Sequence, residues 1–246
     1  MFTICSIVLV FTVLVKGWVL AINIINCYNC RTMFNTGGFD LIYIAIVLGV
    51  ILISMTLHEA MHAYASYWLG DDTAKMQGRL TLNPIKHIDP FMTILLPLLL
   101  AMSGAPVFGG AKPVPFNPNK VQGEEWGIAM VAIAGPLTNF LIAFLIFGLW
   151  VLINPGSDIA NQIFLTAIYV NLGFFVFNMI PIPPLDGSRL LYALAPDFFR
   201  NIMESIEKFG VFFVFIFVLL ASPVLMSFMS DSMAAIFNLF RLIFGL

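Results

Sequence analysis

Residues 41–62 read "LIYIAIVLGVILISMTLHEAMH". The stretch is almost purely apolar up to Met55, and it then places two histidines and a glutamate within the next seven residues. Since about 20 apolar residues in a helix cross the hydrocarbon core of a bilayer, the stretch predicts a membrane span. Imidazole and carboxylate groups are costly at that depth, and they mark functional sites there. The stretch therefore predicts a membrane fold and a site together.

The composition of the whole chain agrees with a membrane fold. Of its 246 residues, 61% are hydrophobic and 10% are charged, against about 45–50% and 25% in soluble domains. We therefore expect an all-α polytopic membrane protein. The charge is near neutral and the basic residues form no stripe, which argues against a nucleic-acid partner. Three cysteines are too few for a disulfide framework, and the single CxxC pair, Cys27 and Cys30, is weak support for redox or metal chemistry.

About five transmembrane helices are expected, because five stretches approach the required length: 2–25, 41–62, 128–153, 162–182 and 209–230. Pro223 predicts a kink in the last of them. The run 91–104 would reach only about 21 Å as a helix, and Pro97 interrupts it, so we expect a re-entrant segment. The tail 233–246 is also shorter than a span and predicts an interfacial helix.

The basic residues indicate the orientation. If 91–104 returns to the side it entered from, the outer loops contain only Arg31 as a basic residue, whereas a full crossing would move several others outside. An excess of Lys and Arg marks cytoplasmic loops. We therefore expect an integral protein of a prokaryotic inner membrane, with its site toward the cytoplasm. The residues then on the cytoplasmic side are Lys75, Arg79, Lys86, Lys112, Lys120, Arg189, Arg200 and Lys208.

Three regions are expected along the chain. Residues 1–32 hold an extra N-terminal helix, which Lys16 and the lack of a small-residue cleavage site distinguish from a signal peptide. Met33 is an alternative start that would remove this helix. Residues 33–210 form the core that contains the candidate site, and residues 211–246 form C-terminal transmembrane or interfacial helices.

The polar residues of the opening stretch have the spacing of a zinc site. His58 and His62 are four residues apart, so they share a helix face, with Glu59 beside them. In this HExxH arrangement two imidazoles bind zinc and the carboxylate handles the proton of the attacking water. A catalytic zinc takes a third protein ligand. Asp186 is the candidate, because it follows a proline-rich break at the cytoplasmic end of 162–182, on the same side of the membrane as His62; a helix-capping role is the alternative.

Other polar residues of the apolar regions leave alternatives open. His87 fits a zinc ligand, a substrate or oxyanion contact, or a structural histidine at the interface. Asn171 and Asn178 are seven apart, so they share a helix face that we expect to point into the bundle. Asn139 and Asn171 fit interhelical hydrogen bonds as well as a site role. For Asn178 we favour binding of the substrate backbone or orientation of the site.

At this point the chain resembles the site-2 protease family of intramembrane zinc metalloproteases, over about residues 41 to 210. The absence of any long polar insertion resembles the compact prokaryotic branch, which has neither a PDZ nor a nucleotide-binding module. The N-terminal run lies outside the resemblance. The stretches that carry it are "HEAMH" (58–62), "GRLTLNPIKHIDP" (78–90), "GGAKPVPFNP" (109–118), "AGPLTNF" (134–140) and "NMIPIPPLDG" (178–187).

The resemblance implies a zinc-dependent endopeptidase that cleaves transmembrane segments of membrane proteins within the bilayer, near the cytoplasmic face. It implies one zinc ion held by His58, His62 and Asp186, with Glu59 as catalytic base. The alternatives are a protease that trims signal-peptide remnants, a polytopic transporter and an inactive relative. No inverted repeat supports a transporter, and the intact Glu59 argues against inactivity. No feature of the sequence indicates an oligomeric state.

The sequence also suggests how the protein would hold a substrate. The resemblance implies supporting roles for Asn139 and Asn178. A transmembrane substrate hides its peptide bonds in helical hydrogen bonds, so cleavage requires local unwinding, and the opened segment can pair with an enzyme strand. The stretch 109–118 predicts a short extended region near the site, in which Val114 and Phe116 keep amide donors toward one edge. A proline-rich connector is the equal alternative.

Overall fold

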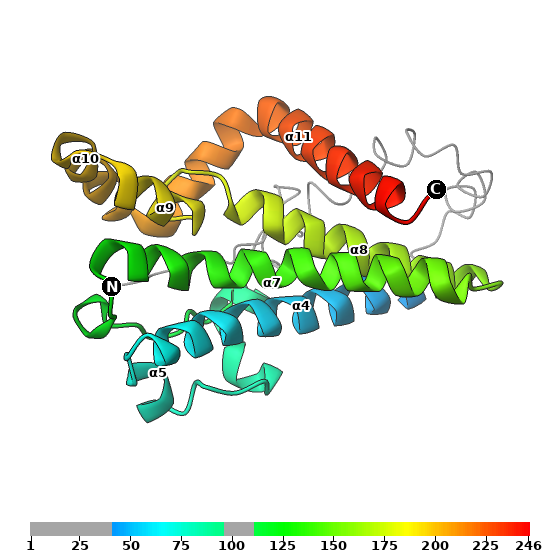
Figure 1. The fold of residues 1–246 in the computed structure, drawn as a ribbon, viewed down its shortest axis with the longest axis horizontal. Helices are drawn as coiled ribbons and strands as arrows, with labels where there is room; N and C mark the ends of the chain where they lie inside the picture. The colour runs from blue at the N-terminus through cyan, green and yellow to red at the C-terminus, as the bar shows by residue number, and fades with distance from the viewer. Residues whose placement is uncertain (1–40, 96–110) are drawn as a thin grey trace.

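The computed structural model describes residues 41–95 and 111–246 (Figure 1). Four helices of this part of the chain are long and apolar enough to cross a membrane. The helices that contain these spans are α4 (Leu41–Trp68), α7 (Glu124–Ile153), α8 (Asp158–Asn178) and α11 (Gly210–Ile243). The predicted span 2–25 and most of the predicted re-entrant segment lie outside the described residues. The expectation of an all-α polytopic membrane protein is confirmed for the part that is described.

Shorter elements connect the long helices, and all of them are helical. Between Ile88 and Ala111 there is an isolated antiparallel bridge, but residues 111–246 and 41–95 contain no β-strand. The expected extended region is therefore reduced to this bridge and a non-helical stretch after it. The short elements are α5 (Thr73–Met76), η2 (Pro84–His87), the π-helical η3 (Pro90–Leu95), η4 (Pro118–Lys120), α9 (Gly187–Leu194) and α10 (Asp197–Glu207).

Helix α7 lies between α4 and α8 and contacts both along its length (Figure 1). Its C-terminal end and the start of α8 form a tight hairpin, because Asn154 adopts a left-handed conformation that stops α7. Ser157 then caps α8 by accepting a hydrogen bond from the Ala160 N–H at 3.1 Å. The hairpin fixes the register of α7 against α8.

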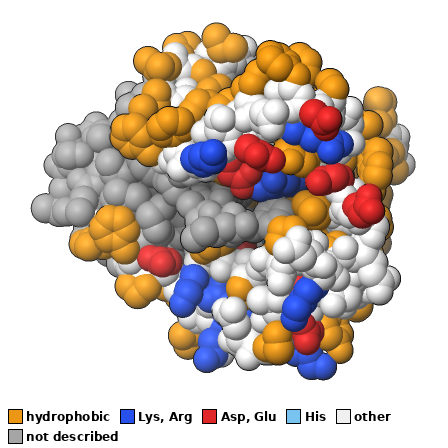
Figure 2. All heavy atoms as spheres, turned by 90° about the vertical axis from the view of Figure 1, so that its left-hand side faces the viewer, with side chains coloured by type: hydrophobic (Ala, Val, Ile, Leu, Met, Phe, Trp, Pro, Cys, Tyr) orange, Lys and Arg blue, Asp and Glu red, His pale blue; other side chains and the backbone are white. Residues whose placement is uncertain are grey.

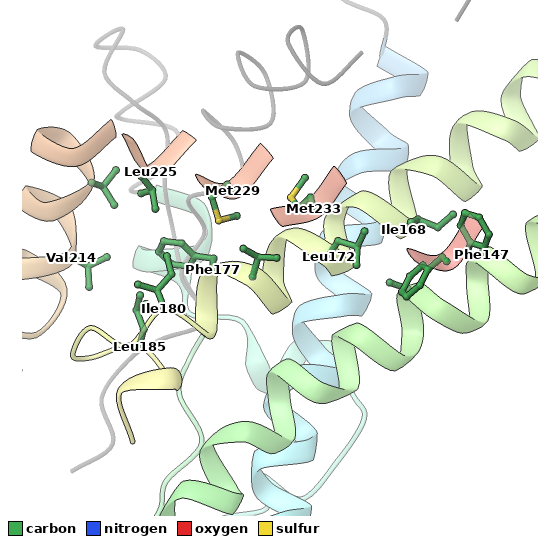
Figure 3. Packing of buried hydrophobic residues seen from close by; sticks show 14 residues of the cluster. Phe147, Ile168, Leu172, Phe177, Ile180, Leu185, Val214, Leu225, Met229 and Met233 are labelled. Atoms are coloured by element: carbon green, nitrogen blue, oxygen red, sulfur yellow. The ribbon is translucent and has the colours of Figure 1, made fainter. Parts of the chain in front are cut away.

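The main hydrophobic core lies between α7, α8 and α11 (Figure 3). Phe147 of α7 and Leu172 of α8 are fully buried, and Met229 and Met233 of α11 cover α8 from the other side. Many apolar side chains on the outer faces of these helices are exposed, among them Leu145 and Leu220. This distribution is typical of helices whose outer faces contact lipid, since burial inside the protein does not account for their apolar residues.

The C-terminal region differs from the expectation. Residues 209–230 and 233–246 were predicted as a span and a separate interfacial helix, but α11 is one helix that changes direction along its length (Figure 1). Pro223 lies inside it, as the predicted kink requires. After Pro223 no helix-breaking residue occurs before α11 ends at Ile243, and the membrane candidate is accordingly 223–243.

Charged side chains gather at the end of the bundle that carries α5 and α10. Figure 2 shows Lys, Arg, Asp and Glu side chains of both signs on this end, with hydrophobic side chains around the rim. The described segments that form it are residues 69–95 and 111–123, between α4 and α7, and the connection from Asn178 to Gly210. Because α4 and α8 both end here, the polar residues of "HEAMH" and the Asp186 segment lie toward the same end.

Candidate metal centre

Three side chains converge between α4 and the start of α9. The Nε2 atoms of His58 and His62 are 3.0 Å apart. The Oδ2 atom of Asp186 lies 3.2 Å from Nε2 of His58 and 3.5 Å from Nε2 of His62. Among the described residues this is a group of histidine, cysteine and acidic side chains that can hold a metal ion. The HExxH segment and the Asp186 segment, which the sequence predicts to meet, are therefore in contact in the structure.

The geometry of this trio fits a zinc ion. Zinc at about 2.0–2.1 Å from each ligand in tetrahedral geometry separates its ligand atoms by roughly 3.3 Å, which matches the three observed distances. The Oδ2 atom of Asp186 is buried and has no hydrogen-bond donor in the described part of the chain. A buried acceptor that faces two imidazole nitrogens is costly without a compensating partner, and a cation supplies it.

The other ring nitrogen of each histidine binds the protein. The Nδ1–H of His58 donates to Oδ1 of Asn139 at 2.5 Å, and the Nδ1–H of His62 donates to the carbonyl of Val131 at 2.8 Å. Because Nδ1 carries the proton in both rings, each Nε2 presents its lone pair to the centre. Metal-binding histidines are oriented by this kind of outer hydrogen bond.

A tight turn delivers Asp186. Helix α8 ends at Asn178, and the chain doubles back so that α9 begins at Gly187. A Cβ atom built on Gly187 would lie 2.4 Å from the carbonyl oxygen of Met179, so only glycine fits beside the end of α8. Leu185 is 1% exposed and anchors the turn in the core. This turn between α8 and α9 holds the Asp186 carboxylate against α4.

Helix α7 approaches the two imidazoles closely at Gly135. A Cβ atom on Gly135 would lie 2.4 Å from Nε2 of His62 and 2.7 Å from Nε2 of His58. Glycine therefore keeps clear the space in front of both lone pairs. Three protein ligands leave the fourth position of a tetrahedral zinc ion to water or substrate, which is the ligand set of catalytic rather than structural zinc.

Glu59 lies beside this centre and is 4% exposed. The N–H of Val114 donates to its Oε2 at 3.2 Å. The Val114 amide, predicted to be open toward a substrate strand, is therefore engaged by Glu59. The residues around Val114 form no strand; they are a non-helical connection, as the alternative predicted, and the amide of Val114 contacts the catalytic candidate.

Arg79 fixes this segment. Its guanidinium, which is largely buried, donates to the carbonyls of Lys86, Lys112 (2.5 Å) and Pro113 (3.3 Å). Burial lowers the pKa of Arg79, and the negative charge of Glu59 opposes this shift. The peptide unit between Pro113 and Val114 thus accepts from Arg79 at its oxygen and donates to Glu59 at its nitrogen.

Residues 156–222 match peptidase family M50. The chain is 41% identical to "Putative zinc metalloprotease YwhC" of Bacillus subtilis over 82% of this chain and 92% of that protein. It is 32% identical to "Putative zinc metalloprotease Rip2" of Mycolicibacterium smegmatis over 75% of this chain and 69% of that protein.

The chain belongs to peptidase family M50. The resemblance to the site-2 protease family is thereby confirmed, and the protein is a zinc metallopeptidase with membrane-spanning helices. A shorter match, 44% identical over 25% of this chain and 31% of the relative, is to "Putative zinc metalloprotease MJ0611" of Methanocaldococcus jannaschii. No solved structure matches the chain.

Two predicted site residues of this M50 peptidase do not join the trio. His87 is fully buried, and its Nε2–H donates to the carbonyl of Thr81 at 2.9 Å, which favours the structural alternative. Asn178 is also fully buried, and its amide donates to the carbonyl of Phe174 in its own helix. Its Oδ1 has no partner among the described residues.

Sequence reasoning missed two contributors to this site of the M50 peptidase. Arg79 entered only as a cytoplasmic charge, and Val131 supplies a backbone carbonyl that no side-chain pattern reveals. The available signal for Arg79 was its place inside the stretch 78–90 that carries the family resemblance, but two of the three carbonyls it binds, those of Lys112 and Pro113, come from a segment more than thirty residues away. Only the tertiary structure brings them together.

Replacing Arg79 with glutamine is expected to loosen the segment over Glu59. The change removes charge-assisted hydrogen bonds worth about 1.5–3 kcal/mol, which corresponds to roughly 10- to 100-fold faster opening. We expect amide exchange at Lys112 and Val114 to accelerate by this factor, as measured by hydrogen exchange and mass spectrometry. Lys120→Gln, which removes an exposed cation paired with Asp72, is the control. Unchanged exchange in Arg79→Gln would show that the hydrogen bonds of Arg79 do not hold the Lys112–Val114 segment in place.

Proposed function

We propose that this M50 peptidase is a zinc-dependent intramembrane endopeptidase that cleaves transmembrane segments of other membrane proteins near the cytoplasmic face. In this proposal His58, His62 and Asp186 bind the zinc ion, and Glu59 is the general base. The observation that carries it is the convergence of three largely buried ligand atoms at one point, with a buried carboxylate beside them.

The chemistry follows from what each group can do. Zinc, when bound, supplies Lewis-acid activation of the attacking water and of the scissile carbonyl. Glu59 accepts the proton of that water and passes it to the leaving amine. The Val114 N–H holds the Glu59 carboxylate in place through Oε2. Because Glu59 and His58 are neighbours on α4, one rigid helix sets the distance between the base and the metal ligands.

A transmembrane substrate must expose its backbone before this chemistry can occur. In this proposal an unwound substrate meets the Lys112–Val114 segment, which lies beside Glu59 and is held there by hydrogen bonds to Glu59 and Arg79. In this proposal the unpartnered Oδ1 of Asn178 accepts a substrate N–H. A substrate that can open its helix easily is favoured, because helical hydrogen bonds in lipid are otherwise satisfied only within the segment.

The orientation rests on the basic residues. All Lys and Arg residues of the described part except Arg241 lie in the two connections at the α5 and α10 end. The positive-inside rule places this end in the cytoplasm. The site lies toward the same end, where α4 runs on to Trp68 beyond His62. The proposed cleavage site is therefore within reach of cytoplasmic water.

Cysteine labelling checks this orientation. In a variant lacking the native Cys5, Cys27 and Cys30, single cysteines are placed at the exposed Asn119 and Gly156, on opposite ends of α7. A membrane-impermeant maleimide is expected to label Gly156→Cys in intact cells and Asn119→Cys only after permeabilisation. The reverse pattern would place the site on the outer face and contradict the proposal.

The function itself is tested in proteoliposomes. We expect the purified protein to cut a single-span membrane protein inside its transmembrane segment, to lose cleavage when a chelator removes zinc, and to recover it with about one zinc per chain. Mass spectrometry of the products locates the cut. A free signal-peptide remnant serves as a second substrate, and a marked preference for it would support the trimming alternative. Cleavage that persists without metal would overturn the proposal.

A further inference from the structure

A buried chain of amide side chains leads away from the candidate zinc ligand His58. Oδ1 of Asn139 accepts the His58 Nδ1–H at 2.5 Å. The amide nitrogen of Asn139 donates to Oδ1 of Asn171 at 2.9 Å and, more weakly, to the carbonyl of Ser54 at 3.4 Å. The chain crosses three helices, since His58 and Ser54 lie on α4, Asn139 on α7 and Asn171 on α8.

The direction of these hydrogen bonds is set at the Asn171 end. The amide nitrogen of Asn171 donates to the carbonyl of Ala167 at 2.8 Å and to Oγ of Ser54 at 2.9 Å. A backbone carbonyl can only accept, so the Asn171 nitrogen must face Ala167. Oδ1 of Asn171 therefore faces Asn139, which in turn can present only its own Oδ1 to His58.

Burial makes this direction costly to reverse. His58 and Asn139 are fully buried, Asn171 is 1% exposed and Ser54 is 3% exposed. Turning the Asn139 amide over would place its N–H groups against the His58 Nδ1–H and its oxygen against the Asn171 oxygen. In a site closed to water, such unsatisfied polar groups are penalised heavily. One arrangement of the chain is therefore strongly preferred.

We infer that Asn171 is a positioning residue that sets the tautomer of His58 through Asn139. With the proton held on Nδ1 by this chain of hydrogen bonds, Nε2 is the ring nitrogen left to bind the metal. This inference rests on the proposed function for the identity of the metal, but the tautomer itself is a property of the metal-free protein. The side-chain hydrogen bonds of Asn171 go to Asn139, Ser54 and Ala167, and none of them goes to the trio.

His62 provides an internal control. Its Nδ1–H donates to the backbone carbonyl of Val131, which cannot turn over and needs no side chain behind it. The two candidate ligands thus have the same tautomer for different reasons. Disturbing Asn171 should affect His58 and leave His62 unchanged, whereas a general loosening of the bundle would affect both rings.

The first test observes the tautomers directly. The protein has only three histidines, so ¹⁵N-histidine labelling gives few imidazole signals to assign. In the metal-free protein we expect a proton on Nδ1 of both His58 and His62, whether or not Nε2 carries a second one. In Asn171→Leu we expect part of the His58 population to lose the Nδ1 proton while His62 stays as it was. An unchanged His58, or an equal change in both rings, would overturn the inference.

The second test measures zinc affinity by competition with a chelator. Loss of an outer hydrogen bond to a metal-binding histidine lowers affinity by about 10- to 100-fold, and we expect this for Asn171→Leu. An aspartate at 139 accepts but cannot donate, so it imposes the Nδ1–H form on His58 without help from Asn171. In the Asn139→Asp background, Asn171→Leu should therefore change the affinity less than threefold.

An equal fall in both backgrounds would show that Asn171 acts by packing alone and would overturn the inference. Asn161→Leu is the matched control, because it removes an asparagine of the same helix whose hydrogen bonds go to Trp150 and Pro155; it should leave zinc affinity unchanged. If the wild type binds no zinc, the proposed function fails. The NMR experiment on metal-free protein still shows whether Asn171 sets the protonation of His58 through Asn139.

Discussion

Replacing Glu59 with glutamine is expected to lower the rate of peptide cleavage by about 10²- to 10⁴-fold, the usual contribution of a general base, while zinc remains bound at one ion per chain. Glutamine keeps the shape of the side chain, and its carbonyl can still accept the Val114 N–H that binds Oε2 of Glu59. It cannot take a proton from water. The measurements are cleavage in proteoliposomes and metal content by atomic absorption.

The matched control is Glu124→Gln, which makes the same chemical change at an exposed carboxylate at the start of α7. Its cleavage rate should equal that of the wild type. Full activity of Glu59→Gln would remove Glu59 from the mechanism. A combined loss of zinc and cleavage would show instead that Glu59 organises the metal centre, and the assignment of the base would then be wrong.

Replacing Gly135 with alanine is the second change with a large expected effect. The added Cβ would lie 2.4 Å from Nε2 of His62 and 2.7 Å from Nε2 of His58, distances that no packed pair of atoms tolerates. The imidazoles or α7 must move, and the three ligand atoms can no longer meet. We expect zinc affinity to fall by roughly 100-fold or more, beyond the effect of losing an outer-shell partner, and cleavage to be lost with it.

The helix itself should not suffer from this substitution. Alanine is favoured over glycine in a helix interior by about 1 kcal/mol, which offsets part of the roughly 1–3 kcal/mol cost of overpacking, so the metal-free Gly135→Ala protein should still fold, with a free energy of unfolding within about 2 kcal/mol of the metal-free wild type. Gly49→Ala is the control, because a Cβ there meets nothing within 4 Å on the same helix that carries the histidines. Normal zinc binding by Gly135→Ala would contradict the close approach of α7 to the centre.

Sequence reasoning was most successful where the chemistry is local. The spacing of His58 and His62 on one helix face needs only the helical repeat, and it is independent of the rest of the fold. The long apolar runs predicted α4, α7 and α8 because a bilayer imposes a minimum length on any span. The end of α11 was divided wrongly between residues 230 and 233, because no helix-breaking residue occurs there and the helix continues to Ile243.

Contacts between segments that are distant in the sequence were harder to predict than the local spacing. The Asp186 carboxylate was predicted to reach the imidazoles on the basis of a shared membrane side, and its distances to them agree. The engagement of the Val114 amide by Glu59 was not predicted, because an extended segment has two edges and the sequence does not say which one a partner takes. The role of His87 was left open, and its bond to Thr81 depends on the fold of its own loop.

By itself, the sequence determined that the chain spans a membrane and carries the residue types of a zinc peptidase, since hydrophobic length and helical spacing are properties of consecutive residues. The tertiary structure alone decided how the centre is held: which carbonyls Arg79 binds, which amides stand behind His58, and why Gly135 must be glycine. The physical reason is that hydrogen-bond direction and close packing depend on atoms from three helices at once, and their relative positions are not written in any one segment.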